Sequence, residues 1–213
     1  MTEPKKRFES YLEELQLEQI PQLMGKFEHY FQLLCYTNRQ VNLVSRNVQP
    51  DKYWVQHFLD SLLALECLDL TDKTVLDFGS GGGLPGIPLK LVVPRCSLVM
   101  LDSVQKKTHA LQEFVEALGL ADTAVICARL EDYAFLGRRP SFDYVVCRAV
   151  ALEERYLAPL RRLLKPSGQV IFYKAQKLND IEKLDYEILL EKTDPDLGMR
   201  KLIGIKQRNL MMR

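Results

Sequence analysis

The feature that most constrains this chain is a short apolar run that ends in Asp77 and passes directly into glycines. Residues 79–86 contain five glycines in eight positions, and residues 87–93 are compatible with a helix. An apolar run of strand length, a glycine-rich turn and a helix together predict a parallel β-strand entering a helix across a loop where a ligand can touch the backbone. A turn that only needs tightening uses far fewer glycines. The segment therefore predicts a nucleotide-type binding site.

The type of nucleotide follows from the residues around the glycines. The loop also satisfies the dinucleotide pattern G-x-G-x-x-G, so a nicotinamide-dependent oxidoreductase is one alternative. However, the carboxylate of Asp77 would repel a phosphate, whereas it can hold a ligand's ammonium group. Pro85 and Pro88 also remove backbone N–H donors that a pyrophosphate would need. The pattern D-x-G-x-G-x-G, which includes Gly79 and Gly81, suits a zwitterion without phosphate, such as S-adenosylmethionine.

A second apolar run, residues 96–102, ends in Asp102 about 20 residues after the glycine loop. This is where a doubly wound fold places the carboxylate that accepts the ribose hydroxyls, so Asp102 is the predicted ribose ligand. The structural alternative is an N-cap, because residues 103–119 are predicted to be a helix and Ser103 could share that function.

The rest of the chain alternates in the same way. Apolar runs predict strands at residues 124–127, 142–147 and 169–174, a helix at 152–164, and loops at 128–132 and 166–168. Strands alternating with helices of this length predict an α/β fold, a Rossmann-like, mainly parallel and doubly wound sheet. Ligands of such sheets bind outside the carboxyl ends of the strands. That rule places five residues along one edge: Gly79, Asp102, Leu130, Glu131 and Arg148.

Residues 1–70 are predicted to form a helical N-terminal extension packed on a binding domain of residues 71–213. Apolar and aromatic residues recur at helical spacing over 8–15, 23–34 and 54–65, which predicts three helices. Base stacking is an alternative use of these aromatic residues, but aromatic residues at this spacing usually form a core.

Composition and charge limit the function classes. No apolar run is long enough to span a membrane and no signal peptide is recognised, so a cytoplasmic protein is expected. The five unclustered cysteines are expected to be reduced and buried, and three histidines without a C-x-x-C motif make a metal site unexpected. The net charge is −4 over residues 1–128 and +5 over residues 129–213. A basic half fits a polyanion such as RNA, although an ordinary solvated surface explains it almost as well.

His57, Asp60 and Ser61 suggest a hydrolase triad, but all three fall within five residues of one predicted helix. A triad is assembled from separate elements, and the G-x-S-x-G elbow is absent. The preferred interpretation is a hydrogen-bonded cluster on the helix surface, facing the binding domain.

In sequence order, several short motifs resemble those of the RsmG (GidB) family, bacterial methyltransferases of small-subunit ribosomal RNA that act at guanine N7. They are Asn38 and V-N-L at 41–43, H-F-L-D-S at 57–61, D-F-G-S-G-G-G-L-P-G-I-P at 77–88, L-D-S at 101–103, C-R-A at 147–149 and Y-K at 173–174. The resemblance implies cofactor contacts at Gly79, Leu84, Leu130, Glu131 and Arg148. Ala175 departs from the glycine that usually follows the lysine in this family.

The chemistry implied by the resemblance needs no general base, because guanine N7 has a free lone pair and no proton to lose. Alignment and site polarity must supply the rate. RNA contacts are expected from basic residues. Arg148 could contact cofactor or RNA phosphate, an interpretation preferred to its alternative, a surface ion pair. Lys174 is a weaker candidate, as are six residues each of which alone is more often a solvated charge: Arg46, Lys52, Arg138, Arg139, Arg200 and Lys201. The expected partner is 16S ribosomal RNA or the small subunit, bound by a monomer. Two alternatives are a methyltransferase with another acceptor and a non-catalytic ribosome-assembly factor.

Overall fold

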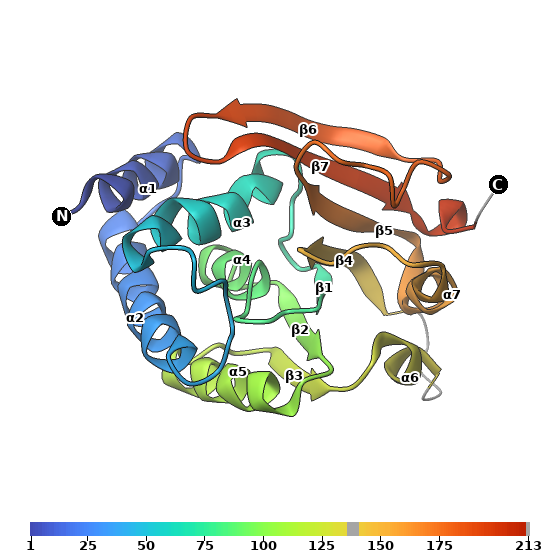
Figure 1. Cartoon of the computed structure of the whole chain (residues 1–213), viewed down its shortest axis with the longest axis horizontal. Coiled ribbons are helices and arrows are strands. Elements are labelled where there is room, and N and C mark those ends of the chain that lie inside the picture. The colour runs from blue at the N-terminus through green and yellow to red at the C-terminus, as the bar shows by residue number, and fades with distance from the viewer. Residues whose placement is uncertain (136–140, 212–213) are drawn as a thin grey trace.

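The computed structural model describes residues 1–135 and 141–211 of the 213-residue chain. Its centre is a seven-stranded sheet in the order β3-β2-β1-β4-β5-β7-β6 (Figure 1). The strands are β1 (Thr74–Phe78), β2 (Ser97–Asp102), β3 (Thr123–Cys127), β4 (Phe142–Arg148), β5 (Leu164–Lys174), β6 (Glu187–Asp194) and β7 (Gly198–Lys206). Strands β1 to β5 run parallel, and β7 lies antiparallel between β5 and β6. The predicted α/β, mainly parallel fold is therefore confirmed.

The order reverses beside β1, because β2 lies on one side of it and β4 on the other. Apolar residues fill both faces of the central strands, with Val75, Leu76, Val145 and Val146 almost completely buried. Such a strand must be covered on both sides, which is why crossover helices follow each one. The reversal places the carboxyl ends of β1 and β4 where a crevice forms in folds of this type.

Two hydrophobic clusters cover the two faces of the sheet. The first contains residues of the N-terminal helices together with α4 (Gly86–Val92) and α5 (Gln105–Ala117). The second contains residues of α6 (Leu130–Phe135) and α7 (Glu154–Leu163). Because the first cluster joins Phe8 to Met100 of β2, the N-terminal helices share a continuous core with the sheet.

The N-terminal helices are α1 (Glu3–Glu14) and α2 (Ile20–Asn38). After a loop, four short helical elements follow: η1 (Pro50–Lys52), η2 (Trp54–Leu59), α3 (Asp60–Leu62) and η3 (Leu63–Glu66). A further short element, η4 (Gln207–Asn209), lies near the C-terminal end of the chain. The ring centroids of Phe8 and Phe27 lie 4.7 Å apart and those of Phe27 and Phe58 5.4 Å apart. The aromatic residues therefore form core, as predicted, but the third helix is not regular, because η2 is a π-helix.

Three expectations about local structure are wrong, and one element was not predicted. Residues 128–132 do not form one loop, because α6 begins at Leu130 with acidic Glu131 and Asp132 in its first turn, a position that the helix dipole favours. Residues 166–168 are part of β5 rather than a loop. The β6–β7 hairpin had no counterpart in the sequence interpretation. Finally, the cysteines are free but not all buried, since Cys127 is exposed.

Within the part of the chain that the structure describes, no helix is both long and apolar enough to cross a membrane.

Candidate functional site

A cavity of about 440 Å³ opens at the carboxyl ends of β1 to β4, and we call it the first cavity. Four of the predicted cofactor residues line it: Gly79, Asp102, Leu130 and Glu131. The sequence interpretation missed the other lining residues: Phe78, Leu101, Ser103, Val104, Lys107, Ala128, Arg129, Ala149, Val150, Arg155 and Tyr156. Several of these directly follow predicted strands, so their position along the chain was the available signal.

The Asp102 carboxylate organises the mouth of this cavity. Its Oδ2 accepts a hydrogen bond from the backbone N–H of Gly81 at 3.0 Å, and its Oδ1 accepts one from Val104 at 2.9 Å. The alternative prediction that Asp102 is the N-cap of the following helix is wrong, because the N-cap of α5 is Val104. Asp102 is 8% exposed and faces the cavity. It can therefore hold the loop and still offer its remaining lone pairs to a ligand's hydroxyls.

Asp77 occupies a different position from the one expected of an ammonium ligand. It is fully buried and is not part of the lining of the first cavity. Its Oδ2 accepts the backbone N–H of Gly86 at 3.0 Å, which fixes the start of α4, while Oδ1 has no partner among the described residues. Burial raises the pKa of this carboxyl to about 7, against the lowering effect of the Gly86 hydrogen bond. The geometry supports a loop-organising role.

The glycine loop makes close backbone contacts. Gly79 has φ +76°, and a Cβ at this position would lie 2.6 Å from Cγ2 of Val150. Only glycine fits a left-handed backbone with so little space. Gly81 and Leu84, two further predicted contacts, lie outside the lining, and Leu84 is buried. The loop thus presents Gly79 to the cavity and uses its other members to shape the turn.

A second cavity of about 720 Å³ adjoins the first. The loop after β4, the end of β5 and the β6–β7 turn line it: Ala149, Val150, Ala151, Tyr173, Lys174, Ala175, Gln176, Lys177, Asp180, Leu197, Gly198, Met199 and Arg200. Ala149 and Val150 belong to both cavities, and we call these two residues the shared wall.

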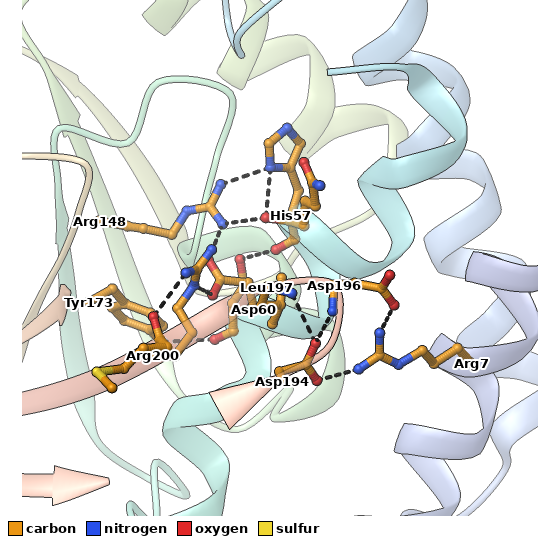
Figure 2. Close-up of polar contacts among 12 residues, drawn as sticks. Arg7, His57, Asp60, Arg148, Tyr173, Asp194, Asp196, Leu197 and Arg200 are labelled. Carbon is orange, nitrogen blue, oxygen red and sulfur yellow. Dashed lines mark hydrogen bonds and ion pairs between the residues drawn. The ribbon is translucent and has the colours of Figure 1, made fainter. Parts of the chain in front are cut away.

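Arg148, expected to contact cofactor or RNA, is instead bonded to the N-terminal extension (Figure 2). One guanidinium nitrogen donates to Oδ2 of Asp60 at 2.8 Å and to the carbonyl of Gln56 at 3.1 Å, and the other lies 3.1 Å from Nδ1 of His57. Its side chain is only 14% exposed. Arg148 therefore forms an ion pair, but a largely buried one with Asp60 of α3 rather than one on the surface, and a contact with cofactor or RNA stays a prediction.

His57, Asp60 and Ser61 do form a polar cluster that faces the sheet, but all three are buried rather than on the surface. Nδ1 of His57 lies 3.1 Å from a guanidinium nitrogen of Arg148 and 3.0 Å from the carbonyl oxygen of Gln56, while Nε2 has no hydrogen-bond partner among the described residues. Burial, reinforced by the charge of Arg148, lowers the pKa of His57 to about 3. Ser61 donates to the carbonyl of His57, so its hydroxyl is part of the helix rather than a nucleophile.

The predicted RNA residues fall into three groups. Lys174, Arg200 and Lys201 are paired with Asp180, Asp60 and Glu191, respectively. Arg46 and Lys52 are exposed in the segment between α2 and η2. Arg138 and Arg139 lie outside the described residues. Within residues 1–135 and 141–211, no group of three His, Cys, Asp or Glu side chains is placed to hold a metal ion.

The residues at the first cavity fit a phosphate-free nucleoside ligand. Gly79 leaves space that any Cβ would fill, and Asp102 supplies a carboxylate acceptor beside it. A sheet in the order 3-2-1-4-5-7-6 with this cavity at its carboxyl edge is the arrangement expected of an S-adenosylmethionine-dependent methyltransferase. Solved structures share this fold. A SAM-dependent methyltransferase from Aquifex aeolicus is 15% identical with a TM-score of 0.57, over 72% of this chain and 93% of that one. A mutant of MtNAS in complex with S-adenosylmethionine is 15% identical with a TM-score of 0.59, over 93% and 83%.

The family model GidB, rRNA small subunit methyltransferase G, matches residues 23–211, and the chain belongs to this family. A ribosomal RNA small subunit methyltransferase G of Carboxydothermus hydrogenoformans is 38% identical over 200 residues, 85% of this chain and 82% of the relative. That of Prochlorococcus marinus is 34% identical over 205 residues, 91% and 78%.

Proposed function

We propose that this chain transfers a methyl group from S-adenosylmethionine to N7 of a guanine in 16S ribosomal RNA. The observation that carries the proposal is the family match over residues 23–211 together with a cavity that fits the cofactor at the expected sheet edge. We further expect the protein to act as a cytoplasmic monomer on the small subunit or its RNA.

The bound cofactor supplies an electrophilic methyl group on a sulfonium. The N7 lone pair forms the new N–C bond while the C–S bond breaks, which yields S-adenosylhomocysteine and a cationic base. No proton leaves N7, so none of the chain's residues has to act as a base. In this proposal Asp102 binds the ribose hydroxyls, Gly79 admits the ligand to the backbone, and Leu130 and Glu131 line the far side of the cavity. The protein contributes alignment of nitrogen, methyl and sulfur, the effect expected to dominate such a reaction.

Mass spectrometry of 16S ribosomal RNA nucleosides from cells with and without the gene tests the reaction. We expect 7-methylguanosine at one site to disappear with the gene and to return when purified enzyme and S-adenosylmethionine are added. Substituting 7-deazaguanine at that site should stop transfer, because carbon replaces the nucleophilic nitrogen. Continued methylation of the deaza substrate would assign another acceptor, and RNA binding without turnover would identify an assembly factor.

The cofactor assignment has a separate test. S-adenosylhomocysteine should stabilise the protein by about 2.7 kcal/mol at 100 times its dissociation constant, whereas NADH should have no effect. Tight NADH binding without adenosylhomocysteine binding would instead favour the oxidoreductase.

A further inference from the structure

The second cavity adjoins the first at the shared wall. Ala149 and Val150 line both cavities, and Cγ2 of Val150 reaches the glycine loop at Gly79. A molecule in the second cavity would therefore lie next to a molecule in the first, beside these two residues. Pockets of this size commonly hold a small ligand or one nucleotide. The arrangement suits two reactants that must meet.

The shared wall has a conformation that needs support. Ala149 has φ +59°, a left-handed backbone that costs an alanine free energy and persists only where neighbouring contacts hold it. The residue before it, Arg148, makes hydrogen bonds to Gln56, His57 and Asp60. These contacts fix the end of β4 immediately before the strained residue.

The carboxylate of Asp60, which bonds Arg148, also holds the opposite wall of the second cavity. Leu197 of the β6–β7 turn and residues 198–200 at the start of β7 form this wall. Nε of Arg200 donates to Oδ1 of Asp60 at 2.7 Å, while Oδ2 of Asp60 accepts from Arg148 (Figure 2). Asp60 is 6% exposed, so little solvent screens either pair. One buried side chain of the N-terminal extension thus bonds both walls at once.

Other contacts brace this arrangement from the same side. Tyr173, which also lines the second cavity, donates its hydroxyl to the carbonyl of Ser61 at 2.8 Å. Arg7 of α1 pairs with Asp194 and Asp196 at the hairpin turn (Figure 2). The N-terminal extension therefore contacts the end of β4, the end of β5 and the start of β7, the three strand ends next to the second cavity.

The charges around the cavity indicate which ligand it takes. Arg148 and Arg200 share Asp60, and Lys174 is balanced by Asp180. Together these five side chains carry one net positive charge. A positive edge attracts the electron-rich O6 and N7 side of guanine and the RNA phosphates. After transfer the base is cationic, and the same charge disfavours it.

We propose that the second cavity receives the acceptor guanine and that Asp60 is a positioning residue. By bonding both Arg148 and Arg200, Asp60 sets the positions of the two walls between which the base lies. This inference rests on the proposed function. Asp60 touches neither reactant, and its effect is transmitted through the two arginines.

The location is tested with Ala175→Trp, which places a large ring into the second cavity from an exposed position. The probes are S-adenosylhomocysteine and 16S ribosomal RNA from cells that lack the gene. We expect the single-turnover methylation rate to fall at least tenfold while adenosylhomocysteine affinity stays within twofold. Gln22→Trp is the control, because Gln22 is exposed on α2 and lines neither cavity. A variant Ala175→Trp that methylates at the wild-type rate would overturn the location.

The positioning role is tested with Asp60→Asn, whose amide can accept from only one arginine and turns a donor toward the other. We expect the single-turnover rate at saturating RNA and cofactor to fall ten- to a hundredfold, with the dissociation constants of both ligands within threefold. Lys192→Met is the control, because it breaks a different contact between extension and hairpin, the pair with Glu66, away from the cavity.

If Asp60→Asn does not fold, Arg200→Lys carries the test, since it keeps the charge but loses the Nε contact. An equal loss of rate in Lys192→Met, or an unchanged rate in the tested variant, would overturn the positioning role. The wild-type enzyme is measured first. Wild-type failure to methylate the RNA would refute the proposed function itself, so the two failures are distinguishable.

Discussion

The two cavities lie side by side on one sheet edge but are held in different ways. At the first cavity, the carboxylate of Asp102 contacts backbone groups that are close in sequence, Val104 at 2 residues and Gly81 at 21 residues. At the second, they join side chains distant in sequence, such as Asp60 with Arg148, 88 residues apart, and with Arg200, 140 residues apart. The comparison shows that a site built from a strand end and a glycine turn is fixed locally, whereas its neighbour depends on how the whole chain packs.

If local backbone shape defines the first cavity, the largest loss should come from Gly79→Ala. The new Cβ would need a left-handed backbone and would lie 2.6 Å from Val150. We expect the free energy of unfolding to fall by about 3 kcal/mol, the sum of backbone strain and overpacking. Adenosylhomocysteine affinity should fall more than tenfold, measured by calorimetric titration.

Gly119→Ala is the matched control for this change. Gly119 also has a left-handed backbone, φ +59°, but nothing lies within 4 Å of the added Cβ. It should lose only about 1 kcal/mol of stability and no cofactor affinity. Equal effects in the two variants would show that the contact with Val150 is irrelevant.

This difference also explains what the sequence could predict. The alternation of strands and helices, the glycine loop and the acidic end of β2 were predictable because period, glycine and strand ends are local signals. The environment of Arg148 was not predictable, because its partners come from the π-helix η2 and from α3, which are distant in sequence. Asp77 was misjudged for a related reason: its spacing suits a ligand contact, and only packing shows that it is buried. The pairing of Asp60 with Arg148 and Arg200 was missed, although the motif that contains Asp60 was noticed.

A sharper test of the first cavity is Asp102→Ala. The change removes a charged acceptor for the ribose and also the acceptor of the Gly81 and Val104 N–H groups. We expect adenosylhomocysteine binding to weaken by about 1.5–3 kcal/mol, with RNA affinity unchanged. Asp102→Asn, which keeps one neutral acceptor, should lose less. Unaltered cofactor affinity with loss of the fold would make Asp102 purely structural.

The second region should respond to pH through His57. The unfolded imidazole titrates near pH 6.5, whereas burial and Arg148 lower the folded pKa to about 3. As pH falls, the imidazole of His57 is therefore protonated in the unfolded state before it is protonated in the folded state. The free energy of unfolding consequently decreases as pH falls from about 6.5 toward 3. At pH 5 the loss relative to pH 7 is about 2 kcal/mol.

The measurement is urea unfolding of wild type and His57→Asn at pH 7 and pH 5. The Asn oxygen can accept from Arg148, so the variant should lose about 2 kcal/mol less than wild type between these pH values. Comparing the two proteins cancels the contribution of Asp77, whose raised pKa has the opposite sign and costs stability as pH rises to about 7. Identical pH slopes would mean that folding does not lower the pKa of His57.

The smallest expected effect concerns RNA, and it depends on which arginines remain available. Arg148 and Arg200 are bonded to Asp60, whereas Arg46 is exposed in the loop whose neighbours Leu43 and Val44 lie against the glycine turn. If Arg46 contacts a phosphate, Arg46→Ala should reduce the slope of log affinity against log salt by about one, because one fewer phosphate is neutralised.

The control is Arg95→Ala. Arg95 is exposed and precedes β2 at the opposite edge of the sheet, so its loss should leave the slope unchanged. Filter binding of 16S ribosomal RNA at several salt concentrations measures both slopes. If Arg46→Ala keeps the wild-type slope, RNA does not reach this loop.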